Sequence, residues 1–122
     1  MSLHIVVDLD SGAPPYEQIR AQVAGHIRAG ALHAGDRLPT VRSLAADLGV
    51  AVGTVQRAYR ELEAAGLVTT RRRAGTTVAG GTRALAPATA LQDAAHAFVA
   101  RARAEGLTDE EITDLVRGAL LR

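Results

Sequence analysis

Two short stretches of helical spacing, separated by a short turn that contains a glycine, most constrain how this chain folds. Apolar residues recur every three or four positions in residues 41–48 and again in residues 55–62, which is the spacing of one buried helix face. Gly49 stands between them where a helix can end, and Thr40 precedes the first stretch where a hydroxyl can cap a helix. Two such helices with a tight turn predict a helix-turn-helix.

The segment after these helices predicts a β-hairpin with a basic tip. Residues 67–71 and 76–79 are rich in Val and Thr, as strands are, and Gly66 ends the preceding helix. The turn between the two strands contains the run Arg72-Arg73-Ala74-Gly75. A helix-turn-helix followed by such a hairpin is a winged helix arrangement.

The rest of the chain adds elements before and after this unit. His4–Asp8 alternates and is rich in β-branched residues, which predicts a short strand, and residues 15–29 have the spacing of a helix. Helical spacing returns in residues 89–105, and Thr108 with Glu111 forms a capping-box pattern that starts another helix. We therefore predict a mainly α fold with a small β-hairpin: a winged helix-turn-helix domain at residues 1–80, a linker at 81–88 and a two-helix dimerisation tail at 89–122.

Composition excludes several other classes of protein. The chain has 48% hydrophobic and 22% charged residues, as globular proteins do, and it has no cysteine for disulfide or thiol chemistry. Its four histidines have no partner at metal-ligand spacing, and no phosphate-binding, serine-hydrolase or zinc-protease motif occurs. We expect no metal, no cofactor and no enzymatic activity. Because we find neither a signal peptide nor a run of 18 apolar residues, we expect a cytoplasmic protein with no membrane partner.

Four spaced motifs run through residues 14–78 without a gap. They are Pro15-Tyr16-x-Gln18-Ile19, Gly30-x-Leu32-x-x-Gly35-x-x-Leu38-Pro39-x-x-Arg42-x-Leu44-Ala45, Thr54-Val55-x-Arg57-Ala58-Tyr59-x-x-Leu62 and Gly66-Leu67-Val68. Their order and spacing resemble the GntR family of winged helix regulators, and the short tail resembles its YtrA subfamily, which lacks large effector-binding domains. The resemblance implies a repressor that binds a palindromic operator in double-stranded DNA as a homodimer, and it suggests control of transporter genes. Activation in place of repression, and release by a small-molecule effector, stay open.

The resemblance and the physics of helix ends together predict the DNA-binding residues. The helix that begins near Val52 is expected to be the recognition helix, because its free N–H groups and dipole favour a phosphate at its start. Arg42 resembles the family arginine that reaches a guanine, Thr54 and Arg57 are placed to touch the DNA backbone, and the hairpin arginines would meet phosphates or enter a minor groove. The predicted set is Thr40, Arg42, Ala51, Val52, Gly53, Thr54, Gln56, Arg57, Arg71, Arg72, Arg73 and Gly75.

Each of these residues also has an interpretation without DNA. An arginine run at a turn is often only a solvated loop, Arg42 alone could be a surface cation, and Thr54 could bond a local carbonyl. Where the family often has Ser and then a polar residue, this chain has Ala51 and Val52. The N-cap side chain is therefore absent, and an apolar contact with a thymine methyl replaces a polar one.

The predicted tail needs a packing partner, because two isolated short helices are marginal in water. The resemblance implies that a second copy covers them, and packing as a lid on the chain's own winged domain is the alternative. The predicted dimer interface consists of Leu91, Phe98, Val99, Ile112, Leu115, Val116 and Leu120. A rival function is a protein-interaction adaptor that does not bind DNA, although an adaptor has no reason to place Arg42, Arg57 and Arg71 on one face.

Overall fold

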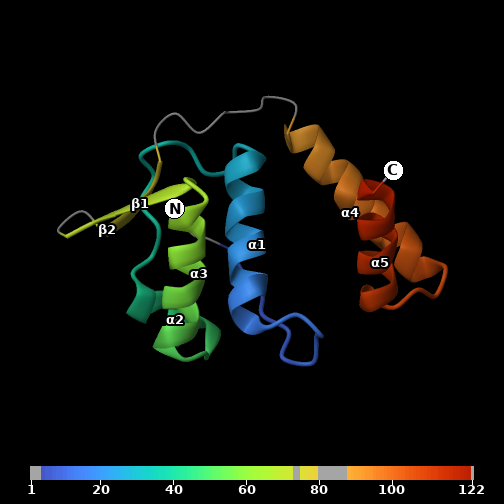
Figure 1. The fold of residues 1–122 in the computed structure, drawn as a ribbon, viewed down its shortest axis with the longest axis horizontal. Helices are drawn as coiled ribbons and strands as arrows, with labels where there is room; N and C mark the ends of the chain where they lie inside the picture. Colours follow the sequence, from blue (N-terminus) through green and yellow to red (C-terminus); the bar gives the residue numbers. More distant parts are fainter. Residues whose placement is uncertain (1–3, 73–74, 80–87, 122) are drawn as a thin grey trace.

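The computed structural model describes residues 4–72, 75–79 and 88–121. Within them, three helices and a hairpin come before two further helices: α1 (Pro15–Arg28), α2 (Val41–Leu48), α3 (Val52–Ala64), β1 (Val68–Arg71), β2 (Gly75–Val78), α4 (Ala88–Ala104) and α5 (Asp109–Leu120). The hairpin, α2 and α3 lie at one end of the molecule, α4 and α5 lie at the other, and α1 stands between them (Figure 1). This confirms the predicted mainly α fold with a small hairpin. Residues 81–87 of the predicted linker lie outside the described residues, and Ala88 already belongs to α4.

The helix ends follow the sequence signals that predicted them. The Thr40 hydroxyl accepts a hydrogen bond from the Ser43 N–H at 3.1 Å, and Gly49 closes α2 with a left-handed φ of 70°. At the start of α5, Thr108 and Glu111 make both hydrogen bonds of a capping box. These contacts confirm the predicted boundaries of α2 and the predicted start of α5.

The first three helices and the hairpin enclose one apolar core. Ile19 and Val23 of α1 and Val55 and Leu62 of α3 are its largest fully buried side chains, and α1 and α3 pack directly on each other. Burying each of these side chains stabilises the fold by about 1.5–3 kcal/mol. Tyr59 joins them and donates its hydroxyl to the Pro39 carbonyl at 2.8 Å, and burial raises the pKa of this phenol. α1 and α3 are therefore held in fixed positions by this core.

The loop before α2 is hydrogen-bonded to the hairpin. The Leu38 N–H donates to the Thr76 carbonyl at 2.8 Å, and the Gly35 N–H donates to the Val78 carbonyl at 2.9 Å. β2 is thus paired on both sides, with β1 along one edge and residues 35–38 along the other. The hairpin is held in a fixed position relative to the start of α2.

The prediction of a strand at His4–Asp8 is wrong. This segment runs along α1, where the side-chain amides of Gln18 and Gln22 take the place of a neighbouring strand. Gln22 pairs with the N–H and carbonyl of Val6 at 3.0 and 2.7 Å, and Gln18 pairs in the same way with Asp8 at 2.7 and 2.8 Å. An extended segment with alternating residues is present, but no second strand lies beside it.

The tail packs partly on its own chain and partly exposes its apolar side chains. α4 and α5 contact each other, and α4 also contacts α1. Ala102 and Ile112 are buried within the single chain, so Ile112, one of the predicted interface residues, has little surface left for a second copy. The other predicted interface residues keep surface that solvent can reach: Val99 is half-buried, and the exposed ones are Leu91, Phe98, Leu115, Val116 and Leu120.

Candidate nucleic-acid interface

α3 presents a polar face on the side opposite the core. Successive residues lie about 100° apart around a helix, so residues 53, 56, 57 and 60 share the face that points away from the buried residues 55, 58, 59 and 62. The structure thus brings three of the predicted residues, Gly53, Gln56 and Arg57, onto one face and leaves them exposed. It adds Arg60, which the sequence analysis missed. The sequence does contain a signal for Arg60, because residues four positions apart share a helix face and Arg60 lies four residues after Gln56.

The first turn of α3 is open to a ligand. Ala51 occupies the N-cap position with no side-chain hydrogen bond, as its methyl group requires. Apart from its chain neighbours and the backbone of its own helix, no atom lies within 4 Å of the position that a Cβ on Gly53 would take, and Val52 is 41% exposed. Thr54, half-buried, follows in the same turn. Backbone N–H groups at such a helix start can therefore reach an anion without a side chain in the way.

Arg57 is held in place by its neighbours. Its guanidinium carbon lies 3.8 Å from the centroid of the Tyr16 ring, and its Nη2 donates to the Tyr16 hydroxyl at 3.2 Å. Its Nε donates to Glu61 at 3.4 Å. The side chain is still 56% exposed, so the guanidinium keeps a side that faces solvent. Within its motif, Tyr16 gave no indication of a part in binding.

The start of α2 contributes a hydroxyl and a guanidinium. Because the Thr40 oxygen accepts the Ser43 N–H, its own hydroxyl proton remains able to donate to a phosphate oxygen. Arg42 lies two residues further along and is exposed. Both predicted residues are therefore accessible to solvent at the start of α2.

The hairpin places further arginines beside these helices. Arg71 and Arg72 are exposed, and Arg73 lies outside the described residues. Gly75 pairs with Arg71 across the hairpin and has a φ of 72°, which favours glycine. The turn alone therefore explains why a glycine stands here, and a contact with DNA is not needed to explain it. Arg37, another residue that the sequence analysis missed, has its Nε 3.9 Å from the position of a Cβ on Gly75.

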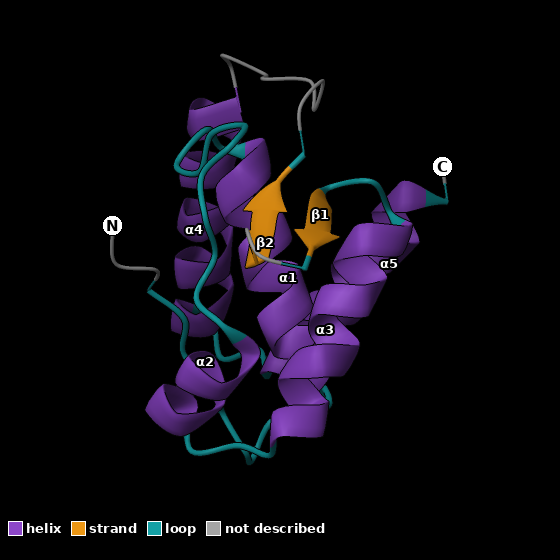
Figure 2. Cartoon of the chain, turned by 90° about the vertical axis from the view of Figure 1, so that its left-hand side faces the viewer, coloured by secondary structure: helices purple, strands orange, loops and turns teal. Residues whose placement is uncertain are grey.

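These parts gather at one end of the molecule. Figure 2 looks onto this end, with α2, α3 and the hairpin in front and the tail helices behind. The exposed arginines there are suited to phosphate oxygens, and the outward face of α3 is narrow enough to enter a major groove.

The described parts of the chain contain no group of three or more His, Asp or Glu residues that could hold a metal ion. No helix within the described ranges is long and apolar enough to cross a membrane.

Comparison with known families identifies the class of protein. The family described as "Bacterial regulatory proteins, gntR family" matches residues 15–78, which is more than half of the chain. The chain belongs to the GntR family. The match spans α1 to β2 and so includes the whole arginine-bearing end. It confirms the family that the four spaced motifs indicated.

Relatives of this GntR protein are transcription regulators rather than enzymes. The HTH-type transcriptional regulator Rv1152 of Mycobacterium tuberculosis is 50% identical over 105 residues, which are 86% of this chain and 84% of that protein. The HTH-type transcriptional repressor YtrA of Bacillus subtilis is 42% identical over 72 residues, which are 59% of this chain and 55% of the repressor. The expectation of a non-enzymatic, YtrA-like regulator is confirmed.

Solved structures support the same conclusion. YtrA from Sulfolobus acidocaldarius, a GntR-family transcription factor, matches with a TM-score of 0.60 at 32% identity over 84% of this chain and 99% of that one. The DNA-binding domain of AraR in complex with operator ORX1 matches with a TM-score of 0.57 at 26% identity over 62% of this chain and 98% of that domain. This GntR protein is therefore a DNA-binding transcription regulator.

Proposed function

We propose that this GntR protein is a repressor that binds a palindromic operator as a homodimer. The observation that carries the proposal is the outward face of α3, where an open helix start and two exposed arginines, Arg57 and Arg60, stand on a rigid core. The operator complexes of the AraR domain and the repressor name of the Bacillus subtilis relative support it.

The proposed contacts follow from side-chain chemistry. α3 lies in the major groove, where Val52 meets a thymine methyl and the Gln56 amide suits an adenine edge. Arg42 forms a bidentate contact with a guanine. Thr40, the first-turn N–H groups of α3 and Arg57 hold phosphates, which fixes the register of the helix on the duplex. Ala51, Gly53 and Thr54 complete this phosphate-facing turn, and Arg71–Arg73 neutralise the flanking backbone.

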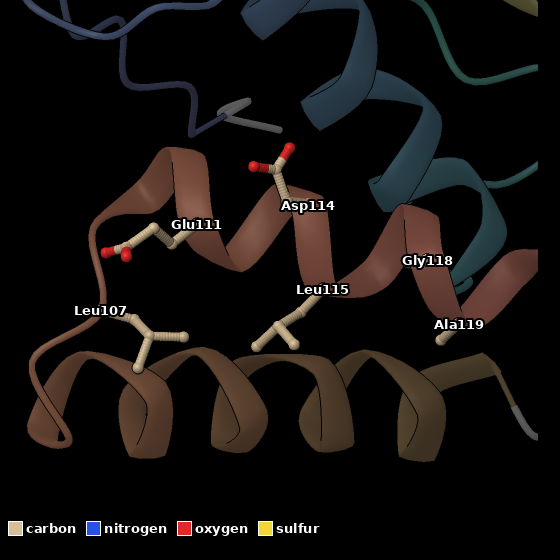
Figure 3. A pocket seen from close by; sticks show the side chains of 6 residues that line it. All are labelled: Leu107, Glu111, Asp114, Leu115, Gly118 and Ala119. Carbon is tan, nitrogen blue, oxygen red and sulfur yellow. The ribbon is translucent and has the colours of Figure 1, made fainter.

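The proposed dimer forms through the exposed apolar side chains of the tail. Phe98, Leu115, Val116 and Leu120 line a groove of about 500 Å³ together with Ala119. A second groove of about 640 Å³ runs beside it along α5, where Leu107 and Leu115 point towards α4 and Asp114 points away from it (Figure 3). A contiguous apolar surface of this kind on a soluble domain marks an interaction site. A second copy of the tail is the occupant that we propose, because it offers the same apolar face in return.

A twofold dimer of this kind determines the symmetry and the half-site spacing of the operator. The two α3 helices would read half-sites about one helical turn apart, about 34–36 Å along the duplex. The sequence of one half-site would then repeat inverted in the other. The proposed site of action is the cytoplasm, with transporter genes among the targets, as the YtrA resemblance suggests.

Selection from a random DNA pool tests the proposal. The full chain is incubated with the pool, the bound fragments are sequenced, and the enriched sequence is placed ahead of a reporter gene. We expect an inverted repeat and lower reporter expression when the protein is present. An unenriched pool at low salt would favour the adaptor, and higher reporter expression would make the protein an activator.

A further inference from the structure

The contact between α1 and α3 at Arg57 joins two residues that are 41 positions apart in the sequence. The Tyr16 ring stacks against the guanidinium at 3.8 Å and its hydroxyl accepts a hydrogen bond from Nη2 at 3.2 Å. Both contacts are with the same tyrosine, so they fix the plane and the position of the guanidinium together. Cation–π contacts with arginine have this geometry.

Tyr16 itself is a fixed support. It lies in the first turn of α1, is half-buried, and packs against the core residues. Its hydroxyl is used as an acceptor and its ring carries no charge. A support of this kind orders an arginine without competing for the anion that the arginine binds.

Glu61, the other partner of Arg57, has different chemistry. Its carboxylate accepts from Nε at 3.4 Å, and its side chain is 41% exposed. Exposed ion pairs of this length are weak. The carboxylate also accepts a hydrogen bond from the Arg57 Nε–H, which is then not available to a phosphate, and its negative charge repels a phosphate nearby.

We propose that Tyr16 is a positioning residue for DNA binding, which holds the guanidinium of Arg57 at the face of α3 while a DNA phosphate takes the place of the Glu61 carboxylate. The inference rests on the proposed phosphate contact of Arg57. An arginine that is already ordered loses less side-chain freedom when it binds. This reduced loss of side-chain freedom favours binding once in each protomer, and therefore twice in a dimer on its operator.

A double-mutant cycle on the full chain tests the inference, with the selected operator and an unrelated duplex as probes. Tyr16→Phe removes the hydroxyl and keeps the ring, so the core packing of α1 is preserved. We expect Tyr16→Phe to weaken binding about 2- to 10-fold on both duplexes, because a phosphate contact carries no sequence information. In the Arg57→Ala background, Tyr16→Phe should change the Kd by less than about twofold.

The second tyrosine of the chain provides a matched control. Tyr59→Phe also deletes a phenol hydroxyl, but that hydroxyl donates to the Pro39 carbonyl and lies away from Arg57. Any loss of affinity from Tyr59→Phe should be the same with and without Arg57. Urea unfolding of each variant shows that it is folded under the binding conditions.

The outcomes separate this inference from the proposed function. If the wild type enriches no DNA, the proposed function fails. If it binds but Arg57→Ala changes nothing, or if Tyr16→Phe weakens binding equally in both backgrounds, Tyr16 does not act through Arg57 and the inference is overturned. Glu61→Gln gives an independent check: binding should tighten by up to about fivefold, and weaker binding would contradict the exchange of carboxylate for phosphate.

Discussion

Replacing Leu115 with Glu should convert the protein from a dimer to a monomer. Leu115 is 51% exposed in the single chain and stands in the middle of the apolar groove of the tail. Ile112 of α5 and Ala102 of α4 are buried and untouched by the change. The tail should therefore keep its helices while a charge enters its apolar groove.

The size of the effect follows from the exposed fraction. Full burial of a leucine stabilises by about 1.5–3 kcal/mol, so covering the half of Leu115 that is exposed contributes about 1 kcal/mol per protomer and about 2 kcal/mol per dimer. A carboxylate in the same place adds a desolvation cost of several kcal/mol in each protomer. Together these terms exceed about 5 kcal/mol, which raises the Kd of the dimer at least about a thousandfold.

Sedimentation and circular dichroism decide this prediction. Leu115→Glu should sediment as a monomer at micromolar concentration, keep its helical signal, and bind a single half-site weakly, since the second half-site is no longer engaged intramolecularly. Ala97→Glu is the matched control, because Ala97 is exposed and lies about 100° around α4 from Phe98. If Leu115→Glu still sediments as a dimer, or if the two variants dissociate alike, the apolar groove is not the interface.

Three further predictions concern the DNA contacts and the tail. Arg42→Ala should cost about 1–3 kcal/mol on the operator and relax the preference at one position per half-site in repeated selection; equal losses on all sequences would make Arg42 a phosphate contact. Replacing Arg71 and Arg72 by Ala should reduce the slope of log K against log salt by about 0.9 for each lost phosphate contact, and an unchanged slope would leave them as a solvated turn. Hydrogen bonds from the Thr108 backbone lower the pKa of Glu111, so the stability that Glu111 provides is present above the normal carboxyl range and is lost as the pH falls through its lowered pKa. In urea unfolding, the difference between the wild type and Glu111→Gln should shrink from pH 7 to pH 3, and a difference that grows would contradict the capping box.

The sequence predicted those parts of the fold that local chemistry determines. Thr40 and Thr108 cap helices where their hydroxyls suggested, and Gly49 closes α2 with a left-handed φ that other residues adopt with strain. The periodic apolar residues of α3 are buried as a single face. Each of these features depends on residues within about one helical turn of each other, so a local pattern is sufficient to predict it.

The sequence could not predict contacts between distant segments. Whether His4–Asp8 forms a strand depends on the segment beside it, and only the fold shows that Gln18 and Gln22 provide side-chain amides there. The burial of Ile112 depends on how α5 lies on its own chain. The partnership of Tyr16 with Arg57 joins residues far apart in the sequence, and periodicity alone places Tyr16 only on the inner face of α1.

The central claim, that two copies of α3 read an inverted repeat, is tested most directly by titrating the full chain against the selected operator with one half-site scrambled. We predict two protomers bound to the intact operator and a loss of affinity of about a hundredfold or more when one half-site is scrambled, because a mismatched half-site removes several base contacts at about 1–3 kcal/mol each. Equal affinity for the intact and the half-scrambled operator, or one protomer bound to the intact operator, would contradict the account.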